Sequence, residues 1–135
     1  MQITRQADYA LRAVIYLSRL RENEKAATSS IAADQKISPS FLAKIVSQLS
    51  IAGLITTSRG AHGGISLARQ PDEISILDVI EAIDGPVFLN ECTSDSNSCP
   101  FLDSCPLKET WRNVQDELIK KLSNATFSRT NITLS

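Results

Sequence analysis

The sequence predicts a mainly α-helical fold: a winged helix-turn-helix with a small β-hairpin wing, followed by a long C-terminal helix. Two short helical patterns joined by a tight turn precede a glycine-rich segment, RGAHGG at 59–64, that lies between two β-branched runs. A last apolar stripe with helical spacing runs through residues 107–122. In a chain of 135 residues these patterns predict one small domain with an appended helix.

Two helices are expected before the turn. Thr4 is suited to cap a helix that runs to about Leu20, and apolar residues on more than one face predict that this helix is largely buried. A polar connection at 21–29 follows, and Thr28 or Ser29 begins a short second helix.

The third helix is expected after a turn at 35–37. Ser38 and Pro39 fit its N-cap and first position, and Gly53 ends it. Four apolar residues share its inner face: Leu42, Ile45, Val46 and Leu49. The wing comes next, with short strands at 54–58 and 65–68.

Two more helices are expected in the second half. Ser75 and Asp78 resemble a capping box with Asp in place of Glu, and the helix they open stops at the Gly-Pro pair at 85–86. Pro106 is suited to open the last helix. Its apolar residues form one stripe: Leu107, Trp111, Val114, Leu118 and Leu122.

From these patterns the chain divides into four segments. They are a winged-helix DNA-binding domain at 1–85, a cysteine loop at 86–106, a dimerisation helix at 107–125 and a tail at 126–135. Burial is limited at this size, so dimerisation would add stability.

Membrane and secreted classes are disfavoured. No apolar run approaches the roughly 18 residues of a membrane span. The first residues lack the apolar stretch and cleavage site of a signal peptide. A cytoplasmic location without a membrane partner is therefore expected.

Charge is unevenly distributed along the chain. Residues 1–70 hold nine Lys/Arg and four Asp/Glu, so their net charge is 9 − 4 = +5, whereas residues 71–135 hold five and eleven, so theirs is 5 − 11 = −6. A basic half favours double-stranded DNA as a partner. The alternatives are a random scatter of surface charge and a winged helix used for protein contacts.

The expected DNA-reading residues lie at the start of the third helix and in the wing. Lys44 suits a phosphate or a guanine edge, and the Phe41 ring suits a thymine methyl, although core packing is an equal alternative for Phe41. Arg59 suits a narrow minor groove. The full set is Ser38, Ser40, Phe41, Lys44 and Arg59.

All three cysteines, Cys92, Cys99 and Cys105, lie in one fourteen-residue stretch. Their C-x6-C-x5-C spacing is too wide for the CxxC pairs of a structural zinc site. Soft thiolates suit zinc, copper(I) or an iron–sulfur cluster, which would need a fourth, non-cysteine ligand. The alternatives are free thiols or a thiol redox switch. A metal-binding loop beside a DNA-reading module suggests that the metal state sets the affinity for DNA.

The sequence resembles the bacterial winged-helix iron–sulfur regulators that include IscR, NsrR, RirA and CymR, over about residues 1–125. The resemblance rests on ITRQADYALRAVIYL, SPSFLAKIVSQLSIAGLI, SRGAHGGISLA, ISILDVIEAIDGP and the three-cysteine loop. It implies a homodimer on a near-palindromic operator, with an iron–sulfur cluster on Cys92, Cys99 and Cys105. CymR-like members lack this cysteine set, so the chain resembles the cluster-binding branch. Within it the chain is most similar to the NsrR/RirA type, because CPFLDSC also looks like RirA-type loops and because of the fourth-ligand pattern.

The resemblance also implies a fourth ligand. IscR-like members place a histidine where this chain has Lys108, whereas NsrR-like members supply an aspartate from the first helix of the other subunit, which matches Asp8. This favours a 4Fe–4S cluster and leaves 2Fe–2S open. The alternative for Asp8 is a first-turn residue favoured by the helix dipole. The family's DNA contacts match the five reading residues, but Ala43 replaces an acidic residue that some IscR-like members use for operator discrimination.

The sequence therefore predicts a homodimeric iron–sulfur transcription factor, a repressor that responds to nitric oxide, iron or redox state. The first alternative is a cluster-free or thiol-redox repressor of the same fold. An enzyme, such as a thiol oxidoreductase, is disfavoured because the chain has no CxxC, no histidine near a cysteine and no phosphate-binding glycine motif.

Overall fold

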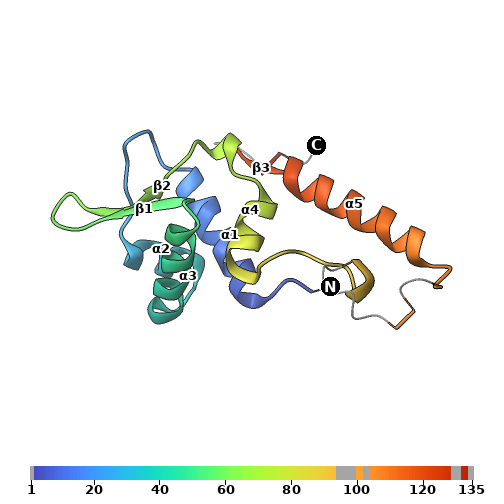
Figure 1. Cartoon of the computed structure of the whole chain (residues 1–135). Coiled ribbons are helices and arrows are strands. Elements are labelled where there is room, and N and C mark those ends of the chain that lie inside the picture. The colour runs from blue at the N-terminus through green and yellow to red at the C-terminus, as the bar shows by residue number, and fades with distance from the viewer. Residues whose placement is uncertain (1, 94–99, 102–103, 129–131, 134–135) are drawn as a thin grey trace.

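The computed structural model describes residues 2–93, 100–101, 104–128 and 132–133 (Figure 1). It confirms the mainly α-helical fold with a two-stranded antiparallel wing. In chain order the elements are α1 (Arg5–Ser18), α2 (Thr28–Gln35), α3 (Pro39–Ile51), β1 (Ile55–Ser58), β2 (Gly64–Leu67), the short 3-10 helix η1 (Pro71–Glu73), α4 (Ile76–Asp84), the 3-10 helix η2 (Glu91–Thr93), α5 (Lys108–Asn124), β3 (Thr126–Phe127) and β4 (Ile132–Thr133).

The expected caps of the first and third helices are present. The Thr4 hydroxyl accepts a hydrogen bond of 3.1 Å from the Ala7 N–H, and Ser38 caps α3 with Pro39 at its first position. Helix α3 ends before Gly53, whose φ of 77° lies in the left-handed region. Local sequence therefore fixes where both helices begin and where α3 ends.

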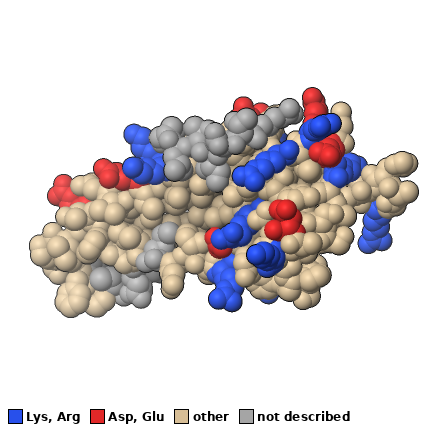
Figure 2. Space-filling model, turned by 180° about the vertical axis from the view of Figure 1, so that it is seen from behind, with Lys and Arg blue, Asp and Glu red and all other residues tan. Residues whose placement is uncertain are grey.

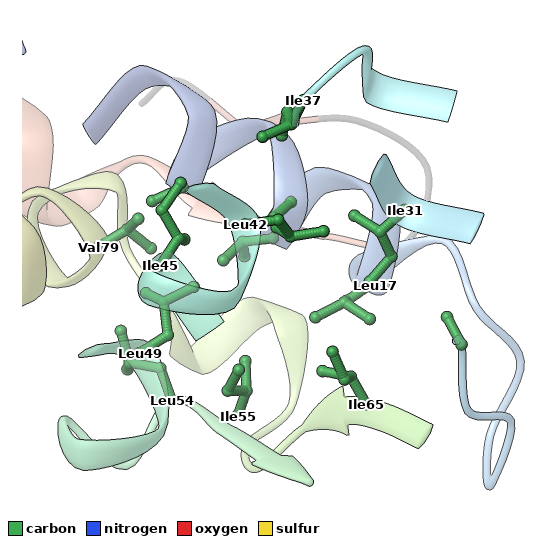
Figure 3. Packing of buried hydrophobic residues seen from close by; sticks show 14 of the residues in the cluster. Leu17, Ile31, Ile37, Leu42, Ile45, Leu49, Leu54, Ile55, Ile65 and Val79 are labelled. Carbon is green, nitrogen blue, oxygen red and sulfur yellow. The ribbon is translucent and has the colours of Figure 1, made fainter. Parts of the chain in front are cut away.

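The core lies around α1, which is packed against α2, α3 and α4 (Figure 1). Apolar side chains from α1, α2, α3, α4 and the wing meet in one cluster (Figure 3). Its fully buried members include Val14, Ile31, Leu42, Ile45, Leu49, Ile74 and Val79. This cluster holds the helix-turn-helix and the base of the wing in one body.

The wing pairs Ile55 with Leu67 and Ser58 with Gly64. The sequence predicts strands at 54–58 and 65–68; β1 begins one residue later than expected and ends where expected, and β2 is shifted by one residue toward the amino terminus. Ala26 also bridges Ile65 through reciprocal backbone hydrogen bonds of 2.9 and 2.8 Å. This bridge ties the connection before α2 to the wing.

Helix α4 begins with the expected capping box. The Ser75 hydroxyl accepts from the Asp78 N–H at 3.0 Å, and the Asp78 carboxylate accepts from the Ser75 N–H at 2.9 Å. The buried Val79 and Ile80 follow, and Gly85 ends the helix. The Asp84 carboxylate accepts a hydrogen bond of 2.7 Å from Thr4, so the end of α4 is joined to the cap of α1.

Removing this capping box should destabilise the fold. Ser75→Ala leaves the Asp78 N–H without its acceptor, and we expect the free energy of unfolding to fall by about 1 kcal/mol. Urea denaturation followed by circular dichroism measures the change. The control is Ser50→Ala, an exposed serine of α3, which should not lower the midpoint. Equal midpoints for Ser75→Ala and wild type would show that the cap contributes nothing.

The last helix differs from the sequence prediction at both ends. Helix α5 begins at Lys108 rather than Pro106, because Pro106 and Leu107 lie in a turn that the Lys108 N–H closes on the Cys105 carbonyl at 3.3 Å. After α5, residues expected in a tail form β3, and Phe127 is buried. The Phe127 N–H donates to the Ile74 carbonyl at 3.1 Å, which returns the chain to the domain core.

Helix α5 extends away from the winged-helix body, with its carboxyl end beside β3 (Figure 1). None of the helices in the described part of the chain has the length and apolar character needed to cross a bilayer.

Candidate functional site

The amino end of α3 presents polar side chains to solvent. Lys36, with φ of 56°, ends α2 in the left-handed conformation, and Ser38 then starts α3 by accepting a hydrogen bond of 3.3 Å from the Phe41 N–H. Ser38, Ser40 and Lys44 are exposed. The structure therefore brings three of the expected reading residues to one accessible helix end, which is the part of a recognition helix that enters a major groove.

Phe41 is only partly exposed. Its ring packs edge-on against Tyr9 of α1, with centroids 5.5 Å apart and planes at 86°. Much of the ring is thus used to join α3 to α1, as the core-packing alternative anticipates. The contact with a thymine methyl stays a prediction for the part of the ring that remains accessible.

The wing loop places Arg59 directly after β1, in an exposed position. The loop needs its glycines: a Cβ on Gly63 would lie 2.4 Å from the Ser58 carbonyl oxygen, and one on Gly64 would lie 2.9 Å from that of Ala26. The exposed His62 lies in the same loop. The backbone therefore holds Arg59 at the base of a tightly folded loop.

Lys25 is a cation near the wing that the sequence did not single out. Its ammonium donates a hydrogen bond of 2.9 Å to the Ser58 hydroxyl, next to Arg59. Its place in a polar connection does not predict a position beside the wing. Lys25 is brought close to Ser58 by the neighbouring bridge between Ala26 and Ile65. Figure 2, seen from behind, shows most Lys and Arg of that face over the winged-helix half. This charge suits the phosphates of DNA.

Two of the three cysteines lie in the described residues. Cys92 is in η2 and Cys105 immediately precedes the turn into α5; both are half-buried. The Cys92 thiol donates a hydrogen bond of 2.9 Å to the Asn90 side-chain oxygen. Cys99, the third predicted ligand, lies outside the described residues. The described thiols thus sit on the two segments that flank the middle of the cysteine loop.

Gln115 joins the segment before Cys92 to α5. Its Nε2 donates to the Val87 carbonyl and its Oε1 accepts from the Leu89 N–H, both at 2.7 Å. Among the described residues of α5, only the Gln115 side chain is buried. The sequence did not single it out; its signal is a polar residue at the edge of the apolar stripe.

Asp8, the predicted fourth ligand, is half exposed on α1. Its carboxylate pairs with Arg12 at 3.0 Å, and 51% of its side-chain surface is accessible. In the part of the chain that the structure describes, no three His, Cys, Asp or Glu side chains gather into a metal site. Ligation by Asp8 therefore stays a prediction that involves a second chain.

The apolar stripe of α5 is largely uncovered within one chain. Leu107 is 52% exposed and Val114 41% exposed, and the other members of the stripe are partly exposed. A helix that keeps one apolar face accessible while extending from its domain is suited to pack against another chain.

Comparison with known proteins gives consistent matches over nearly the whole chain. Residues 3–130 match the family model Rrf2, described as an iron-dependent transcriptional regulator. CymR of B. subtilis, the global cysteine regulator of that organism, is similar with a TM-score of 0.79 and 28% identity, covering 96% of this chain and 95% of that chain. The oxidised form of Staphylococcus aureus CymR has a TM-score of 0.75 and 27% identity, covering 98% and 99%. IscR of T. potens, at 24% identity and a TM-score of 0.74 over 96% and 85%, shares the fold.

Proposed function

The chain belongs to the Rrf2 family of DNA-binding transcriptional regulators, and from this membership we propose that it is an iron–sulfur repressor that acts as a homodimer. In this proposal residues 1–85 bind operator DNA, 86–106 hold the cluster and 107–125 form the dimer contact. Cluster state, altered by nitric oxide, iron supply or redox state, sets the affinity for the operator.

The observation that carries the proposal is the placement of the thiols. Cys92 and Cys105 are partly accessible and lie on two segments that both join α5, and Cys99 lies between them in the sequence. Three soft thiolates fit an iron–sulfur cluster chemically. When bound, the cluster would supply a centre whose loss or modification reports the signal.

The homodimer is supported by the uncovered stripe of α5. Packing the stripe against a second chain would remove apolar surface such as that of Leu107 and Val114 from water. A second chain would also bring its own α1, and with it Asp8 of the partner subunit, to complete the ligand set. Dimerisation and cluster binding would then be coupled.

A direct test is the composition of the protein purified without oxygen. We expect a brown protein with visible absorption, and with iron and acid-labile sulfide bound to each subunit. Colourless protein that also fails to take up iron and sulfide during anaerobic reconstitution would contradict the proposal.

A second candidate is a cluster-free regulator controlled by thiol oxidation. The chain is similar to CymR of two organisms, and one of these structures is an oxidised form, which supports this candidate. This candidate predicts a chain without iron whose operator affinity changes reversibly with peroxide and dithiothreitol. Metal analysis and intact-mass measurement of the oxidised protein separate the two candidates.

The role of Asp8 gives a finer test. We expect Asp8→Ala to weaken the cluster without preventing its assembly, because three thiolates remain and a carboxylate exchanges more readily than a thiolate. Visible spectra and the rate of cluster loss to a chelator measure the change. Arg12→Ala is the control, since it removes the ion pair but keeps the carboxylate. If Asp8→Ala holds its cluster like wild type, Asp8 serves only the first turn of α1.

A further inference from the structure

We propose that Gln115 is a positioning residue that fixes Cys92 relative to Cys105 and thereby sets how firmly the cluster is held; this inference rests on the proposed function. Gln115 is the buried polar side chain of α5, with 9% of its surface accessible. A glutamine whose amide is buried needs a compensating set of hydrogen bonds.

Those hydrogen bonds go to one short segment of backbone. The amide donates to Val87 and accepts from Leu89, each at 2.7 Å, so a single side chain satisfies a carbonyl and an N–H two residues apart. Both contacts are short; the one to the buried Val87 is shielded from water, and the one to Leu89 is partly buried. The segment that leads to the first cysteine is thus held in one register against α5.

The turn that contains Cys92 follows at once. The Thr93 N–H and hydroxyl both donate to the Asn90 carbonyl, at 3.1 and 2.8 Å, and the Asn90 N–H donates to the Thr93 hydroxyl at 3.2 Å. These bonds close η2 around Cys92. Fixing residue 89 therefore also limits where the Cys92 sulfur can lie.

Cys105 lies in the turn that leads into the same helix. Its carbonyl accepts from the Lys108 N–H at 3.3 Å, and its own N–H donates to the Phe101 carbonyl at 2.8 Å. Gln115 lies seven residues after Lys108, about two helical turns further along. Both thiols therefore lie on segments that contact α5: η2 packs against this helix, and Gln115 adds hydrogen bonds to the segment that leads to Cys92.

Two variants and one control test this role in the full-length protein. Gln115→Met keeps the length of the side chain and removes both hydrogen bonds. Gln115→Glu keeps the acceptor for the Leu89 N–H but turns a second oxygen toward the Val87 carbonyl. Asn113→Met makes the same kind of change at an exposed position of α5. Each protein is loaded with its cluster anaerobically, and cluster loss to a chelator is followed by visible absorption.

We expect Gln115→Met to lose its cluster roughly tenfold faster than wild type or more, as for other residues that orient metal ligands. Gln115→Glu should lie between the two, and Asn113→Met should match wild type. In the cluster-free proteins, hydrogen exchange at residues 87–93 should accelerate in Gln115→Met while exchange in α1 and α3 stays unchanged. That second readout separates positioning of the loop from general destabilisation.

The outcomes distinguish this inference from the function it rests on. Wild type that binds no iron and sulfide overturns both together. If wild type holds a cluster and Gln115→Met holds it equally long, the positioning role is wrong and the proposed function stands. The role is also wrong if Gln115→Met loosens the whole fold evenly. Should Gln115→Met fail to fold, Gln115→Glu decides by the same criteria.

Discussion

Replacing Cys92 or Cys105 singly by alanine should abolish stable cluster binding and leave a folded dimer. Each substitution removes one of three thiolates, and the remaining two with a carboxylate make a poor ligand set for an iron–sulfur cluster. Both cysteines are partly exposed and lie outside the core of the winged helix, so folding should persist. Cys99→Ala is expected to behave in the same way.

The measurement is iron and sulfide per subunit after anaerobic reconstitution, together with the native mass. Ser104→Ala, an exposed neighbour in the same loop, is the matched control and should retain full iron. A single cysteine variant with the iron content of wild type would exclude ligation by three thiolates.

Loss of Lys44 should cost about 1–3 kcal/mol of operator affinity in each half-site, if its ammonium reaches a base edge from α3. Arg59→Ala should weaken binding through the wing and lower the salt dependence by roughly one unit for each phosphate that is no longer neutralised. Because a dimer uses each residue twice, both effects should roughly double on a palindrome relative to one half-site.

Fluorescence anisotropy over a salt series measures both effects, with cluster content held constant. The probe is a duplex that the wild-type protein has selected from a random-sequence library, compared with a scrambled duplex. Lys120→Ala, which removes an exposed charge from α5, is the control and should bind like wild type. Wild-type affinity in both Lys44→Ala and Arg59→Ala would show that DNA is bound by another surface.

Local chemistry allowed much of the fold to be predicted. Thr4, Ser38 and Ser75 each cap a helix as expected, because a cap depends on a hydroxyl and on an N–H three residues away. The wing was also predictable from its glycines, although the strand limits differ by about a residue. Such limits depend on pairing across the hairpin, which sequence periodicity does not resolve.

Features that depend on distant contacts were missed. The burial of Phe127 results from its pairing with Ile74, more than fifty residues earlier, and a two-residue strand carries no periodic signal. The role of Gln115 is of the same kind, because it lies in contacts with Val87 and Leu89. The local signal in α5 is only a polar residue at the edge of the apolar stripe, which does not reveal the backbone groups that its amide binds.

In the candidate site, too, the features set by local sequence were predictable and those set by distant contacts were not. Exposure of Ser38, Ser40, Lys44 and Arg59 follows from helix and hairpin periodicity, and the structure has all four accessible. Phe41 instead packs partly on Tyr9, a contact between two helices. The proposed ligand role of Asp8 involves a second chain, so the structure of one chain does not test it.

The most direct test of control by the cluster is operator affinity of one preparation with and without its cluster. The duplex selected by the protein is titrated anaerobically by anisotropy, first with the cluster-loaded dimer and then with protein from which a chelator has removed it. We expect the two dissociation constants to differ by roughly 5- to 150-fold, the usual range of coupling between two sites. Equal affinities, with iron and sulfide confirmed in the loaded sample, would contradict control of DNA binding by the cluster.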